Sequence, residues 1–173
     1  MLEKKRLQSG FTLIEVMVVI SITALLMVLS VPNFHTYERN ARVRDSAKVL
    51  RSFFWEAQGL AMAPKTADIT KYSISLIKGQ DSNTKFMIKD SNGTVVSEVA
   101  LKKDVVIDNV LLDGSSQSSA FLINFKTGNR DGGKMEFSTS GKELVVRLSS
   151  SLSTLKYDIV LNTTTSSINL KKV

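Results

Sequence analysis

The sequence predicts an α+β protein in which a long N-terminal α-helix packs on an antiparallel β-sheet or a small β-sandwich. Three observations lead to this fold class. An apolar run lies near the N-terminus, a helical repeat of apolar residues follows it, and the second half of the chain alternates with a period of two between turn signals. A chain of 173 residues is long enough for one domain plus an additional element.

The composition excludes several kinds of function. The chain has no cysteine, so it has no disulfide, no thiolate nucleophile and no cysteine-based metal site. It also contains no Gly-x-Ser-x-Gly motif, no glycine-rich phosphate loop and no cluster of metal-ligand residue types. We therefore expect no enzymatic activity, no cofactor and no metal. The net charge of +7 is compatible with anionic partners such as lipid or DNA, or simply with a basic surface.

The N-terminal segment combines a basic stretch with an apolar run. Residues 1–10 carry Lys4, Lys5 and Arg6, and residues 11–31 are apolar apart from Glu15 and a few hydroxyl residues. About 20 apolar residues are needed for a helix to cross a bilayer, and basic flanks usually stay in the cytoplasm. The segment predicts a single-pass helix in the inner membrane, with a cytoplasmic N-terminus and an extracytoplasmic body. A cleaved secretory signal is less favoured, because its apolar region is shorter.

Glu15 is the unusual residue of the apolar run. An ionised side chain deep in a bilayer costs on the order of 2.5–3.5 kcal/mol on insertion scales. One interpretation places Glu15 at the interface, at the N-terminus of the helix, where the helix dipole stabilises its charge. The residue types alone leave this interpretation open beside a role in assembly.

The stretch "GFTLIEVMVVISITALLMVLSVPNF", after a short basic leader, resembles the class III signal peptides of type IV prepilins and type II secretion pseudopilins. The matching features are the leader Lys4–Arg6, Gly10, the run from Phe11 to Glu15, and Pro32. The resemblance implies that prepilin peptidase cuts between Gly10 and Phe11, removes residues 1–10 and N-methylates Phe11. It further implies that Glu15 pairs with the terminal amine of a neighbouring subunit.

The same resemblance implies a structural subunit, a minor pilin or pseudopilin, in a type IV pilus or a type II secretion filament. The expected partners are prepilin peptidase, other pilin or pseudopilin subunits, the inner-membrane assembly platform, and the lipid bilayer before assembly. The missing cysteines are a departure, because many major pilins contain a disulfide-closed loop.

A second, amphipathic half of the helix is predicted over residues 32–63. Pro32 is expected to kink the helix, and Pro64 to end it. Apolar or small residues recur at steps of three and four and should form the buried face: Val43, Ala47, Leu50, Phe54, Ala57 and Ala61. The aromatic residues Phe53, Phe54 and Trp55 are expected to anchor the helix to the core of the body.

Residues 64–173 are predicted to form the β-rich body. Nine alternating runs indicate strands, "YSISLI", "KFMIKD", "TVVSEVAL", "VVIDNVLL", "AFLINFK", "KMEFS", "ELVVRLS", "YDIVLN" and "SINLKK". The pattern of this body is similar to H-type minor pseudopilins and FimT-type minor pilins.

That second similarity suggests an alternative function, a DNA-binding minor pilin of an uptake system. The candidate phosphate contacts are four basic side chains, Arg147, Lys156, Lys171 and Lys172. The FimT-type tail often ends in Gly-Arg-x-Arg, whereas this chain ends in "SINLKKV". DNA binding is therefore the less favoured interpretation.

Overall fold

A computed structural model describes residues 11–128 and 132–173, without the side chains of residues 29–33. The chain divides into two compact units, Met1–Tyr37 and Glu38–Val173. From Glu38 onward, the second half of the predicted helix belongs to the same unit as the β-rich body. The boundaries predicted from the sequence, after residues 10, 31 and 63, divide the chain by expected role and remain predictions.

The long helix is present as α1, Leu13–Met62. Thr12 caps its N-terminus, because the Thr12 Oγ1 accepts a hydrogen bond from the Glu15 backbone N–H at 3.3 Å. The last turn closes with the Ala63 N–H donating to the Gly59 carbonyl at 3.1 Å, directly before Pro64. The helix assignment runs through position 32. The predicted kink at Pro32 remains a prediction.

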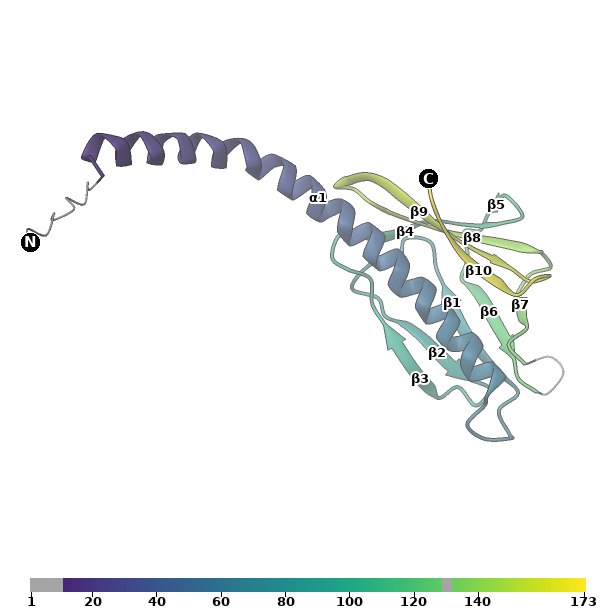
Figure 1. The fold of residues 1–173 in the computed structure, drawn as a ribbon. Coiled ribbons are helices and arrows are strands. Elements are labelled where there is room, and N and C mark those ends of the chain that lie inside the picture. Colours follow the sequence, from purple (N-terminus) through teal and green to yellow (C-terminus); the bar gives the residue numbers. More distant parts are fainter. Residues whose placement is uncertain (1–10, 129–131) are drawn as a thin grey trace, which may run out of the picture. The chain divides into compact units, whose positions relative to one another are not determined.

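Ten strands lie in the described part of the chain, all in the second unit and all paired antiparallel (Figure 1). Sheet A has the order β3-β2-β1-β6-β7 and contains β1 (Lys71–Leu76), β2 (Phe86–Asp90), β3 (Val95–Val99), β6 (Phe121–Lys126) and β7 (Met135–Phe137). Sheet B has the order β10-β9-β8-β4-β5 and contains β4 (Val106–Leu112), β5 (Ser115–Ser116), β8 (Glu143–Ser150), β9 (Ser153–Asn162) and β10 (Ser167–Lys172).

The predicted α+β fold is confirmed, and each of the nine alternating runs contains a strand. Two details differ from the sequence prediction. The stretch expected to be only a turn contains β5, because Asp113 and Gly114 adopt positive φ angles of 47° and 85° and fold the chain back onto β4. The strand β9 also begins at Ser153, before the alternating run "YDIVLN", because its first residues continue the pairing with β8.

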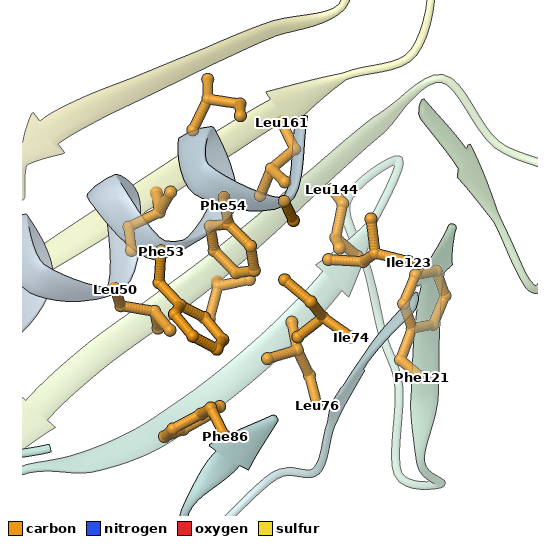
Figure 2. Packing of buried hydrophobic residues seen from close by; sticks show 14 of the residues in the cluster. Leu50, Phe53, Phe54, Ile74, Leu76, Phe86, Phe121, Ile123, Leu144 and Leu161 are labelled. Carbon is orange, nitrogen blue, oxygen red and sulfur yellow. The ribbon is translucent and has the colours of Figure 1, made fainter. Parts of the chain in front are cut away.

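The amphipathic half of α1 shares one hydrophobic core with both sheets. All six residues of the predicted buried face are fully buried: Val43, Ala47, Leu50, Phe54, Ala57 and Ala61. Figure 2 shows Phe54 among Ile74 of sheet A and Leu144 and Leu161 of sheet B. The apolar residues that recur with the helical period therefore form the face of α1 that packs against the two sheets.

The aromatic anchor is formed by Phe53 and Phe54 and does not include Trp55. Phe53 is 4% exposed and Phe54 is 0% exposed, whereas Trp55 is 48% exposed. The Arg51 guanidinium carbon lies 4.5 Å from the centroid of the Trp55 ring, a cation–π contact on the helix surface. The prediction that Trp55 anchors the core is wrong, because position 55 falls one step beyond the buried stripe.

Polar contacts hold this half of the helix to the body along its length. The Asn40 side-chain oxygen accepts a hydrogen bond from the Ser153 hydroxyl at 2.6 Å. The Ser46 hydroxyl accepts one from the Lys102 backbone N–H at 3.0 Å. Near the C-terminus of α1, the Gln58 Nε2 donates to the Gly133 carbonyl at 3.2 Å and the Ser166 carbonyl at 3.0 Å. Gln58 therefore joins α1 to a turn from each sheet.

Tyr72 presents a buried hydroxyl that has no hydrogen-bond partner among the described residues, although its side chain is fully buried. An unpaired buried hydroxyl costs about 1–3 kcal/mol. We expect Tyr72→Phe to keep or raise the free energy of unfolding, whereas Tyr72→Ala should lower it by about 3–5 kcal/mol. Chemical denaturation of both variants checks this, and a Tyr72→Phe variant that is clearly less stable would contradict it.

Candidate functional site

The first unit exposes a continuous apolar surface on α1. The large apolar side chains between Phe11 and Val28 are all exposed, from 46% for Val16 to 84% for Phe11. Exposed apolar surface of this extent marks a region that is covered by a partner or a membrane. The described part of this segment therefore has the character of a contact surface rather than of a solvated helix.

Glu15 is the single ionisable side chain among residues 11–34 and lies in the first turn of α1. Its backbone N–H is within hydrogen-bond distance of both Thr12 Oγ1, at 3.3 Å, and the Thr12 carbonyl, at 3.1 Å. Within residues 11–128 and 132–173, its carboxylate forms no ion pair. The first turn therefore fixes the backbone of Glu15, while its carboxylate remains available to a cation outside the chain.

The role of Thr12 was not predicted from the sequence. The run from Thr12 to Glu15 is a Ser/Thr-x-x-Glu capping box, in which a hydroxyl residue precedes the helix and a glutamate follows three positions later. This signal was present in the sequence. It shows that Glu15 is also close to the positive end of the helix dipole, where a carboxylate is stabilised.

The cleavage site is only partly described. Residues 1–10, including Lys4–Arg6 and Gly10, lie outside the described residues, while Phe11 begins the described part as an exposed residue before the helix. Cleavage between Gly10 and Phe11 and methylation of Phe11 remain predictions. No helix in the described part of the chain is long and apolar enough to cross a membrane.

Two of the four basic residues considered for DNA contacts are held by acidic side chains. Arg147 on β8 donates two hydrogen bonds to Asp158 on β9, at 2.8 Å and 2.7 Å. The hydrogen bonds to Asp158 raise the pKa of Arg147 above its ordinary value. Lys156 Nζ lies 3.0 Å from a carboxylate oxygen of Asp108.

The other two basic residues are on the edge strand of sheet B. Lys171 and Lys172 are exposed at the end of β10 and form no ion pair within the described residues. Charged side chains on an edge strand also discourage unwanted pairing with another chain. The structure thus leaves two of the four candidate cations uncompensated.

The described part of the chain offers no group of three or more His, Asp or Glu side chains that could hold a metal ion. The single histidine, His35, is exposed on α1. The stretch 129–133 superficially resembles a calcium loop in sequence, and its residues 129–131 lie outside the described residues.

Comparisons with known proteins agree with the N-terminal motif. Residues 5–31 match the family described as the prokaryotic N-terminal methylation motif. Two relatives, each the type IV major pilin protein PilE1 of Neisseria gonorrhoeae, are 34% identical to the chain. The first similarity extends over 112 residues, 62% of this chain and 61% of the relative. The second extends over 104 residues, 58% of this chain and 51% of the relative.

The chain thus spans between half and two thirds of the length of the curated relatives it matches. No solved structure gives a significant match. Both relatives are pilins, and this similarity confirms the prediction that the chain is not an enzyme. The narrower likeness of the body to H-type pseudopilins and FimT-type pilins receives no support from these comparisons. The prepilin-type N-terminal motif and the similarity to major pilins confirm the predicted resemblance of the chain to the type IV pilin family.

Proposed function

We propose that the chain is a structural subunit of a type IV pilus-type filament, processed by prepilin peptidase and assembled through its N-terminal helix. The observation that carries the proposal is the exposed apolar surface from Phe11 to Val28, with Glu15 as its single charge. The body has a core of its own, and the buried residues of that core include none of the side chains from Phe11 to Val28.

In a pilin, such a surface is covered in two different ways, before and after assembly. Before assembly it lies in the inner membrane as a single-pass anchor, with residues 1–10 in the cytoplasm and the body outside. After assembly the same side chains pack against the helices of neighbouring subunits. An inner-membrane assembly platform is the expected partner for the transfer between the two.

Glu15 is expected to form an ion pair with a neighbouring subunit during assembly. After cleavage, Phe11 carries a cationic amine, whose unperturbed pKa is near 8. In an apolar environment a charge is costly alone and favourable beside its opposite. The Glu15 carboxylate has no cation among the described residues of its own chain, so it is available to the Phe11 amine of a neighbouring subunit.

Within this function we favour a minor subunit over a major one. The missing cysteines exclude the disulfide-closed loop that many major pilins contain. The similarity to PilE1 favours a pilus over a secretion pseudopilus. The abundance of the chain relative to other subunits in purified filaments tests the first point, because a minor subunit is present in few copies.

DNA binding by the body is the second candidate function, and the basic residues of sheet B now argue against it in part. Arg147 and Lys156 already contact acidic side chains, so of the four candidates only Lys171 and Lys172 form no ion pair with another described residue. Phosphate binding depends on the number of free cations, so we expect any DNA affinity to be weak and strongly salt-dependent.

The processing step provides the direct test. In cells that contain prepilin peptidase, mass spectrometry of the membrane-extracted protein should show a chain that begins at Phe11 and carries one additional methyl group. A bulky replacement such as Gly10→Leu should block the cut, while Gly10→Ala is expected to be cut in part. An intact Met1 terminus on the wild-type chain in these cells would contradict the proposed function.

A further inference from the structure

We propose that the outer face of sheet A holds a binding site for an acidic saccharide of about two sugar units. The site is a hollow of about 390 Å³ in the body, formed by β1, β2, β6 and the loop between β1 and β2. Ligand sites in proteins typically occupy ~300–1,000 Å³, so this hollow is at the small end of that range.

The hollow arises from the sizes of neighbouring side chains on one sheet face. Along β1, Ile74 and Leu76 are buried in the core, so the alternate residues Ser73 and Ser75 lie on the opposite face. The register places Ser75 beside Leu122 of β6 and Ser73 beside Lys89 of β2. Small residues on the central strand between long residues on its neighbours make a trough along β1.

One end of the trough contains a fixed and nearly buried hydrogen-bond donor. Gln80 is 8% exposed and lines the hollow. Its Oε1 accepts a hydrogen bond from the Ile77 N–H at 3.2 Å, and its backbone carbonyl accepts one from the Ile107 N–H at 2.9 Å. Its Nε2 donates to no atom of the described residues. An immobilised side chain with a free donor is a preorganised ligand contact.

The charges around the hollow favour an anion. Lys85 and Lys89 line it, and none of its lining residues is acidic. Lys85 forms an ion pair with Glu98, whereas Lys89 has no ion-pair partner in the part of the chain that the structure describes. An uncompensated ammonium beside an unpaired amide N–H matches a carboxylate, which accepts hydrogen bonds only.

The rest of the lining indicates a sugar as the carrier of that carboxylate. The hydroxyls of Ser73 and Ser75 both donate and accept hydrogen bonds, as sugar hydroxyls do. Met87 and Leu122 add an aliphatic wall suited to the C–H face of a sugar ring. The Ser75 hydroxyl has no partner within the described residues, so a ligand hydroxyl would not have to displace an existing bond.

The test uses the full chain in detergent and measures binding of digalacturonic acid by saturation-transfer NMR and calorimetry. Maltose is the neutral disaccharide for comparison, and diglutamate is the acidic peptide. We expect digalacturonic acid to bind at least tenfold more tightly than either. Added salt should weaken its binding, because the lysines are exposed and their charges are screened.

Two variants probe the site, and one serves as a matched control. Lys89→Gln should lower the affinity about tenfold, equivalent to ~1.4 kcal/mol, and Ser75→Leu should abolish binding by filling the trough. Lys71→Gln removes a charge from the same face of β1 outside the hollow and should leave the affinity unchanged. Circular dichroism checks that each variant is folded. If Ser75→Leu does not fold, Lys89→Gln still tests the site.

The proposal is overturned by any of three results: no binding of digalacturonic acid, equal binding of maltose or diglutamate, or an equal loss with Lys71→Gln. The assay measures the unassembled chain, so its outcome is independent of processing and of filament assembly.

Discussion

Replacing Glu15 by glutamine is expected to leave cleavage after Gly10 intact and to reduce incorporation into the filament by more than a hundredfold. The carboxylate forms no ion pair within the described residues, so its removal costs the subunit only the interaction with the helix dipole, roughly 0.3–1 kcal/mol. In the filament, however, the Phe11 amine of a neighbour would be buried without its partner. Leaving one charge of a buried pair alone costs roughly 3–5 kcal/mol, and each ~1.4 kcal/mol is tenfold in an equilibrium.

The capping box allows the charge of Glu15 to be separated from its role in the helix. The Thr12 hydroxyl accepts its hydrogen bond from the backbone N–H of residue 15, which glutamine also carries, so Glu15→Gln removes the charge and keeps the cap. Thr12→Ala does the reverse, since it keeps the carboxylate and removes a cap worth about 1 kcal/mol. If pairing governs assembly, Glu15→Gln fails to join filaments and Thr12→Ala joins them.

The measurement is co-purification of each variant with its filament partners, together with mass spectrometry of the N-terminus. If a correctly cleaved Glu15→Gln chain is incorporated normally, the pairing role is refuted. The alternative, a glutamate stabilised only by the helix dipole and the interface, would then account for the residue.

Replacing Phe54 by alanine is expected to lower the free energy of unfolding of the body by about 3–5 kcal/mol. The ring is fully buried between α1, sheet A and sheet B, with Ile74, Leu144 and Leu161 around it (Figure 2). Removing it leaves a cavity where three elements meet, and these elements cannot all move inward to fill the space. The effect is therefore expected at the upper end of the range for core residues.

Trp55 provides the matched control for Phe54. It is the next residue and an aromatic of larger size, but it is 48% exposed and contacts Arg51 on the helix surface. Trp55→Ala should cost about 1 kcal/mol or less, mainly the cation–π contact. A fragment of residues 38–173, the second compact unit, is the sample for chemical denaturation.

Far-UV circular dichroism should follow unfolding in these experiments, because Trp55 is the single tryptophan and its fluorescence is lost in the control. Equal losses for Phe54→Ala and Trp55→Ala would contradict the packing of the core. A fragment that remains unfolded would show that the first unit is needed for the body to fold.

The sequence alone determined the elements of this protein that have a strong local period. The steps of three and four from Val43 to Ala61 specified the buried face of α1, because a helix places such residues on one side. The period of two specified nine of the ten strands in the same way. The N-terminal motif determined the family likeness, because Gly10, the run from Phe11 to Glu15, and Pro32 are read locally.

Tertiary structure alone decided the features that depend on contacts between distant residues. The division of the strands into two sheets joins β1 to β6 and β4 to β8, and no local pattern states which strands are neighbours. Trp55 lies outside the core because each residue advances the helix by about 100°. Only the packing of the sheets shows where the buried face of α1 ends. Similarly, the sequence allowed Arg147 to be a DNA contact. The register of β8 and β9 places Asp158 beside it, and only the tertiary structure shows this pairing. Pairing between strands is a property of the whole fold, and it decides which charges and which hollows remain open to a partner.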